Sequence, residues 1–219
     1  MVCSGASSVP GLSSAIIDHY LPEFSVLQHV DYAIATAQLT NQGLATTAAV
    51  LSYAGKPFTT LNQGKNKAIY GWQGLRLKSF WQLGRRFLGN CAIPDLALFP
   101  KRYPTLSSIN FKASLELKPL HLMLWCMSWM VRMRLLPSLD KLAMPMLKLS
   151  RLFDVFGNNN TGFYMTMTGL SPKKKEQTIH FEIYAQKGDG LYIPCIPAIL
   201  LTEKLCDERL NQTGAMACM

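Results

Sequence analysis

The first twelve residues constrain the fold most, because they predict a strand, a tight loop and a helix start in immediate succession. Residues 2–4 are expected to end a buried strand, and small residues form the loop that follows. Ser7 and Ser8 can cap the exposed N–H groups of the next helical turn, and Pro10 suits that turn because proline has no N–H. Ligands of α/β proteins bind at loops that leave the carboxyl ends of strands. Because no sheet-forming segment precedes residue 2, we expect the chain to be the second half of a two-domain enzyme.

The composition is that of a folded chain. Its 219 residues are 49% hydrophobic and 16% charged, which provides for a sizeable core in one or two domains and argues against disorder. The most apolar stretch, residues 122–131, is too short to cross a bilayer. The six cysteines have neither close pairing nor metal-ligand spacing, so a reducing compartment fits best. We therefore expect a cytoplasmic protein with no membrane association and no metal site.

Positive charge is concentrated in the first half of the chain. The formal net charge is +9, and residues 32–94 contain no Asp or Glu but seven Lys and Arg. Such a surface concentrates anions, which can be nucleic acid, a nucleotide phosphate or a carboxylate substrate. A solvated basic surface explains the charge equally well. Nucleic acid is the least favoured partner, because the sequence has no recognised nucleic-acid-binding motif.

Hydrophobic periodicity predicts both sheet and helices. Alternation of apolar and polar residues over 109–117 is typical of a strand with one buried face. Turn residues predict hairpins over 58–68, 76–87 and 163–185, and an extended segment covers 26–38. Helices are predicted over 10–21, 43–54, 120–133, 138–153 and 196–210. The expected fold class is α/β or α+β.

Several catalytic motifs are present only in part. The sequence has no Gly-x-Gly-x-x-Gly, and Asn90-Cys91 replaces the Lys-Ser/Thr that a P-loop requires after residues 84–89. Residues 5–9 resemble a nucleophile elbow, but Val9 stands in place of its second glycine. His180-Phe181-Glu182 followed by Pro194-Cys195 resembles a deaminase zinc signature, but Ala198 stands where the second cysteine ligand would be. These motifs therefore predict no hydrolase, phosphate-loop or zinc chemistry.

An ordered set of segments resembles the saccharopine dehydrogenase-like oxidoreductases, over essentially the whole chain. They are Gly-Ala-Ser-Ser-Val-Pro-Gly-Leu-Ser at 5–13, Leu-Ser-Tyr-Ala-Gly-Lys-Pro at 51–57, Tyr-Gly-Trp-Gln-Gly at 70–74, Ile-Pro-Asp-Leu at 93–96, Phe-Pro-Lys-Arg-Tyr-Pro at 99–104 and Gly-Asp-Gly at 188–190. The resemblance implies a mixed, largely antiparallel sheet with packing helices, as in the C-terminal domain of that family. That domain binds the substrate, and a preceding Rossmann domain binds NAD or NADP.

The resemblance also implies a domain division. Residues 1–22 would be a remnant of the domain junction, and residues 23–219 the substrate-binding and dimerisation domain, truncated at its C-terminal end. The loop formed by Gly5, Ala6, Ser7, Ser8, Pro10 and Gly11 would face the nicotinamide. Family members move a hydride to or from NAD(P), and the best-known ones form or cleave a secondary amine between an amino acid and an oxo acid. Without its nucleotide-binding half, this chain is not expected to bind the cofactor or turn over alone.

The expected substrate is small, anionic and amino-acid-like. Arg85, Arg86 and Arg102 are the predicted anion-binding residues, because a guanidinium can hold a carboxylate with two hydrogen bonds. Asp95 is predicted to orient one of them and Trp72 to line the pocket. The alternative is that Arg85 and Arg86 are surface charges of a hairpin and that Asp95 caps a helix.

A second function class stays open, namely a non-catalytic module for protein interaction or dimerisation. Its partner would be a second copy or a separate Rossmann-domain chain. We expect its exposed apolar interface on the 10–21 helix and the 26–38 strand. Binding of NADPH would separate an enzyme from such a module.

Overall fold

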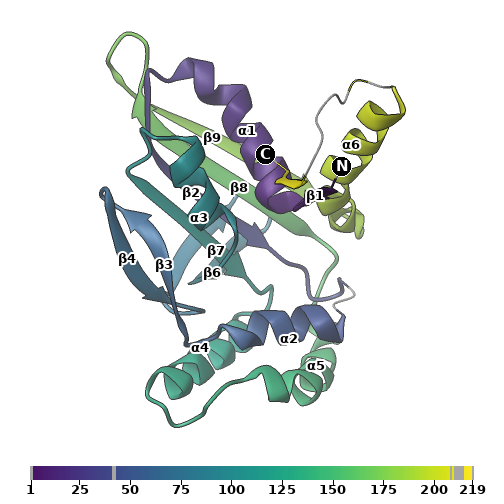
Figure 1. Cartoon of the computed structure of the whole chain (residues 1–219). Helices are drawn as coiled ribbons and strands as arrows, with labels where there is room; N and C mark the ends of the chain where they lie inside the picture. The colour runs from purple at the N-terminus through teal and green to yellow at the C-terminus, as the bar shows by residue number, and fades with distance from the viewer. Residues whose placement is uncertain (1, 41–42, 208, 210–214, 219) are drawn as a thin grey trace.

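The fold is built on a six-stranded mixed sheet (Figure 1). This computed structural model describes residues 2–40, 43–207, 209 and 215–218. The strand order is β5-β6-β7-β2-β8-β9. The strands are β2 (Val26–Ala35), β5 (Arg76–Phe80), β6 (Gly84–Asn90), β7 (Ser108–Ser114), β8 (Thr161–Leu170) and β9 (Glu176–Ala185). Only β2 and β7 pair in parallel within this sheet, so the expected mixed, largely antiparallel α+β fold is confirmed.

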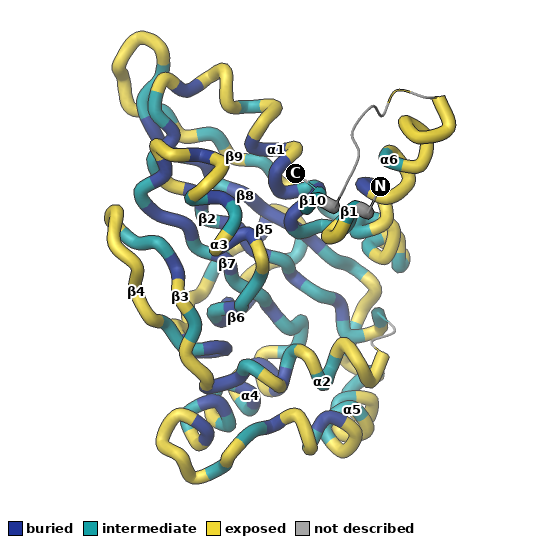
Figure 2. Tube along the Cα trace, in the orientation of Figure 1, coloured by how far each residue is buried: buried dark blue, intermediate teal, exposed yellow. Residues whose placement is uncertain are grey.

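The main core lies on one face of the sheet. Because side chains alternate along a strand, Val30 and Tyr32 of β2 point to this face, together with Phe111 of β7. Helices α1 (Ser13–Tyr20) and α3 (Asp95–Arg102) cover it and contribute Ile17 and Phe99. On the opposite face, a smaller cluster joins Ala33 and Ala35 to Phe80, Leu88 and Tyr164. The sheet centre is therefore buried on both sides (Figure 2).

A second core forms where three helices meet near one end of the sheet (Figure 1). They are α2 (Leu44–Ser52), α4 (Lys118–Arg132) and α5 (Ala143–Arg151), and they bury Leu51, Leu124 and Ala143 together with Trp72. The long helix predicted over 138–153 is divided, because α5 is flanked by separate 3₁₀ turns. A separate hairpin, β3 (Pro57–Asn62) and β4 (Lys65–Tyr70), turns at Gln63-Gly64, both of which have positive φ.

The two ends of the described chain meet in a parallel ribbon. β1 (Val2–Ser4) pairs with β10 (Ala215–Ala217), and α6 (Ile196–Cys206) lies beside them (Figure 1). The predicted order of strand, loop and helix at the start of the chain is confirmed, but Val9 is extended and α1 begins at Ser13 rather than at residue 10. The prediction that this strand is buried was wrong, because Ser4 is exposed and Cys3 half-buried. The end of the helix predicted over 196–210 lies partly outside the described residues.

The exposed apolar interface expected on the 10–21 helix and the 26–38 strand was wrongly located. β2 is hydrogen-bonded on both edges, to β7 and β8, and α1 buries Ile16 and Ile17 against the sheet. Exposed large apolar side chains occur at several other places in the described chain, including Trp81, Val155 and Phe156 as well as α6 and the turn before it, and Leu21 is exposed at the end of the 10–21 segment. Over the described ranges, no helix has the length and apolar character needed to cross a membrane.

Candidate functional site

A cavity of about 540 Å³ lies at the carboxyl ends of the parallel strands β2 and β7. We call it the junction pocket. Ala35 ends β2 beside Ser114 at the end of β7, and the first residues of β8 form the adjoining wall. The ends of parallel strands are where α/β proteins bind ligands. The remaining walls come from the N-terminal loop, α2 and the segment around Gly190, and no charged side chain lines the pocket among the described residues.

The N-terminal loop reaches the junction pocket through Ser7 and Ser8. Its shape depends on Gly5, which has φ +79° and whose missing Cβ would lie 2.5 Å from Cδ of Pro10. Gly11 is buried, and a Cβ there would lie 3.0 Å from Cβ of Pro197 in α6. Of the predicted loop residues, Ser7 and Ser8 therefore line the pocket, whereas Gly5, Pro10 and Gly11 shape the loop or pack it against α6. Ala6 is half-buried and is not part of the lining.

Aromatic side chains line another part of the junction pocket. Trp72, whose φ is +59°, is 2% exposed, and its backbone N–H donates to the Asn90 carbonyl at 2.8 Å. Tyr53 and Phe163 also line the pocket. Flat apolar walls with a few polar groups are typical of sites for small ring-containing ligands. The prediction that Trp72 lines a pocket agrees with this geometry, although its role in binding substrate stays a prediction.

Two residues that the sequence analysis did not single out as site residues make a polar contact in the junction pocket. The Tyr53 hydroxyl lies 2.9 Å from the Cys91 Sγ. Burial raises the pKa of Cys91 to about 11 and also raises the pKa of Tyr53, so both groups are neutral at pH 7. Nearby, the Thr161 Oγ1 is buried and has no hydrogen-bond partner among the described residues. The pocket thus offers neutral hydroxyl and thiol groups for hydrogen bonding.

The Gly-Asp-Gly segment at 188–190 approaches β8 closely. A Cβ on Gly190 would lie 1.8 Å from the Thr161 Oγ1, so only glycine lets this segment close the pocket against β8. The segment thereby comes next to the N-terminal loop, which is about 180 residues earlier in the sequence.

Arg86 lies away from the junction pocket, in a buried ion pair. Its Nη2 is 3.6 Å from the Glu116 Oε1, and both side chains are less than 10% exposed. Burial lowers the pKa of Arg86, and Glu116 opposes that shift. Arg85, the preceding residue of β6, is exposed.

Asp95 and Arg102 link α3 to its neighbours. The Asp95 Oδ2 accepts hydrogen bonds from the Ser13 Oγ at 2.5 Å and the Tyr32 hydroxyl at 2.8 Å. Arg102 pairs with Asp18 of α1 at 2.7 Å. Of the five predicted substrate residues, the structure brings only Trp72 to the junction pocket with Ser7 and Ser8. The anion-binding role of the arginines stays a prediction.

Comparison with known proteins shows the fold. No protein-family model matches the chain, and no curated protein matches its sequence. The structure is similar to that of apo histidine-tagged saccharopine dehydrogenase (L-Glu forming) from Saccharomyces cerevisiae, with a TM-score of 0.58 and 9% identity. The match covers 94% of this chain but 65% of the yeast chain, so this chain spans less than two thirds of the length of that protein. At this identity the likeness shows a shared fold, which agrees with the fold-level resemblance in the sequence.

Proposed function

We propose that the chain is the substrate-binding part of an NAD(P)-dependent oxidoreductase of the saccharopine dehydrogenase kind. The observation that carries the proposal is the junction pocket, where Ser7 and Ser8 meet Trp72 at the carboxyl ends of β2 and β7. The fold shared with the yeast dehydrogenase supports the same proposal. The substrate in this proposal is small and anionic. Arg85 is its candidate partner, because it is exposed and no carboxylate pairs with it in the part of the chain that the structure describes. Arg85 lies outside the lining of the junction pocket, so in this proposal the anionic end of the substrate extends beyond that pocket.

The pocket suits only one end of the cofactor. When bound, NAD(P) supplies or accepts a hydride. Trp72 and Tyr53 would hold the flat nicotinamide ring, and the unpartnered Thr161 hydroxyl would bond its amide. The described pocket walls have no cation for the pyrophosphate, and the sequence has no Gly-x-Gly-x-x-Gly. We therefore propose that a nucleotide-binding domain, in the same or another chain, completes the site.

The β1–β10 ribbon is the proposed attachment point for that domain. Among the described residues, each of its strands pairs only with the other, so each has one open edge. Open edges carry unpaired N–H and C=O groups that accept further strands. The ribbon is parallel and continues directly into the loop at Ser7, as expected of two strands at the border of a parallel sheet.

Binding of the reduced nicotinamide mononucleotide tests the proposal. We expect saturation-transfer NMR to show contacts from the protein to the nicotinamide protons, and none to the adenosine protons of 2′,5′-ADP. Ser7→Trp, which fills the pocket, should abolish the nicotinamide signal, whereas Ser79→Trp on the exposed face of β5 should keep it. If the folded wild-type chain gives no nicotinamide signal, the assignment of the junction pocket to the nicotinamide is wrong.

A protein-interaction or dimerisation module is the second candidate function. Leu191, Tyr192, Ile199, Leu200 and Leu205, on α6 and the turn before it, are each at least 50% exposed. Exposed apolar patches are typical of interfaces, and this candidate requires that these side chains form one. Self-association without nicotinamide binding in the same experiment would favour this candidate.

A further inference from the structure

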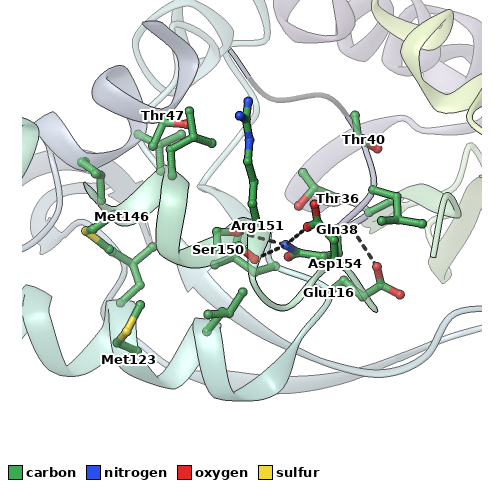
Figure 3. Close-up of a pocket in the computed structure, with 18 residues that line it drawn as sticks. Thr36, Gln38, Thr40, Thr47, Glu116, Met123, Met146, Ser150, Arg151 and Asp154 are labelled. Atoms are coloured by element: carbon green, nitrogen blue, oxygen red, sulfur yellow. Dashed lines mark hydrogen bonds between the residues drawn. The ribbon is translucent and has the colours of Figure 1, made fainter. Parts of the chain in front are cut away.

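A second cavity, of about 350 Å³, lies among α2, α4, α5 and the segment that follows β2 (Figure 3). We call it the helical pocket. It shares a wall with the junction pocket, formed by Thr36, Thr40, Val50 and Leu115, but its other lining residues are different. Its volume is within the range of small-molecule sites.

One part of the helical pocket is aliphatic. Met123 and Leu124 come from α4, Met146 and Leu147 from α5, and Leu51 from α2. No aromatic ring, cysteine, histidine or lysine belongs to the lining found in the described chain, so no flat ring is stacked and no strong nucleophile is present. Methionine and leucine side chains adapt to a flexible chain. This part therefore suits an unbranched aliphatic chain.

The carboxylates of the helical pocket already have partners. The Glu116 Oε1 pairs with Arg86, and its Oε2 accepts the backbone N–H groups of Gln38 at 2.7 Å and Asn158 at 3.0 Å. The Asp154 Oδ1 accepts a hydrogen bond from the Gln38 Nε2 at 2.8 Å. These bonds hold the negative groups in the fold and lower their availability to a cationic ligand.

The positive group of the helical pocket, by contrast, is available. Figure 3 shows the Arg151 side chain extended away from Asp154 and Glu116, with Thr47 and Thr40 to either side in that view. Across the described ranges, no carboxylate pairs with Arg151. A guanidinium suits a carboxylate, which it can hold with two hydrogen bonds.

We propose that the helical pocket binds an unbranched aliphatic monocarboxylate of the fatty-acid kind. The tail lies among Met123, Leu124 and Met146, and the carboxylate pairs with Arg151. This site is separate from the one proposed for the nicotinamide and does not depend on it.

Displacement of a fluorescent probe, 11-(dansylamino)undecanoate, tests the proposal on the whole chain. We expect the probe to bind saturably. Decanoate should displace it at a concentration about tenfold lower than decanol does, because a hydrogen bond to a charged group strengthens binding by about that factor. Decylamine should displace the probe least. Equal or better displacement by decanol or decylamine would overturn the assignment of the carboxylate to Arg151, and absence of saturable binding would overturn the site itself.

Variants locate the two ends of the ligand. Arg151→Gln should weaken decanoate to the level of decanol and leave decanol unchanged, whereas Lys148→Gln, on the same helix but outside the pocket, should change neither. Met123→Trp should abolish binding by filling the aliphatic part. A thermal melt verifies that Met123→Trp is folded. If it is not, Leu147→Trp fills the same aliphatic part from α5. Retention of binding in a folded filling variant would overturn the location. Nicotinamide binding should survive Arg151→Gln, which distinguishes this site from the junction pocket.

Discussion

The hydrogen bond from Tyr32 to Asp95 gives the most direct test of the packing between the sheet and α3. Tyr32 is 0% exposed, and its hydroxyl donates to the Asp95 Oδ2 at 2.8 Å. Tyr32→Phe removes that donor and keeps the ring. A hydrogen bond to a charged group contributes about 1.5–3 kcal/mol, so the free energy of unfolding at pH 7 should fall by that amount.

The pH dependence of this loss follows from the pKa of Asp95. Burial raises that pKa above 3.8, and the hydrogen bonds from Ser13 and Tyr32 oppose the rise. Tyr32→Phe removes one opposing bond, so the pKa of Asp95 rises further in the folded variant. A raised carboxyl pKa destabilises the fold only where the group ionises, so the deficit is smallest below the ordinary carboxyl pKa. It reaches its full size as the pH rises through the raised value.

Urea unfolding at pH 3.5 and pH 7 measures both effects, as the shift in midpoint multiplied by the slope. Tyr192→Phe is the matched control, because that residue is 68% exposed and should change the unfolding free energy by less than about 0.5 kcal/mol. If Tyr32→Phe also costs less than about 0.5 kcal/mol at pH 7, or costs more at pH 3.5 than at pH 7, the reasoning is refuted.

Two further predictions concern the buried ion pair and the buried thiol. Glu116→Gln leaves Arg86 charged and unpaired in the interior, so urea unfolding should show a loss of about 3–5 kcal/mol. Arg76→Gln, which breaks an exposed pair, should cost less than about 1 kcal/mol, and equal losses would contradict the burial argument. Cys91 should react with iodoacetamide about 100-fold more slowly than an unperturbed thiol, because its pKa is raised from 9.0 to about 11. Tyr53→Phe removes the bond that lowers this pKa and should slow labelling further in mass spectrometry, and faster labelling would contradict the assigned direction.

Local patterns in the sequence predicted most of the secondary structure. Ile109 and Phe111 alternate with Asn110 and Lys112, and this period of two predicted a strand over 109–117. The strand is confirmed as β7 with Ile109 and Phe111 buried, but it ends at Ser114, so residues 115–117 were wrongly included. The turn between β3 and β4 was also predicted correctly. Gln63 and Gly64 have positive φ there, and glycine adopts such a backbone without strain. These signals lie within a few residues of one another, so they need no knowledge of the tertiary structure.

Pairing between distant residues could not be predicted in the same way. The sequence presents Arg86 as a free cation, but Glu116, 30 residues later, neutralises it. Asp95 looked like a helix cap or an orienting group for an arginine, yet its partner Tyr32 is 63 residues away. The order of the strands in the sheet decides which carboxylates each arginine meets. A charge pattern in the sequence therefore cannot say which arginines are available to bind anions. The arginine predictions therefore depended on contacts that no local pattern contains.

The two cavities have a common structural origin, which explains why they suit different ligands. Parallel pairing makes β2 and β7 end side by side at Ala35 and Ser114, and the chain continues from them into α2 and α4, which pack together with α5. The N-terminal loop and the start of β8 border the same strand ends. The strand ends are consequently bordered by two unlike groups of segments. The N-terminal loop, Trp72 and β8 supply rings and small polar groups to the junction pocket, whereas α4 and α5 supply aliphatic side chains to the helical pocket. Since ring contacts and chain contacts come from separate elements, filling the helical pocket from α5 should leave nicotinamide contacts intact, and filling the junction pocket at Ser7 should leave decanoate binding intact.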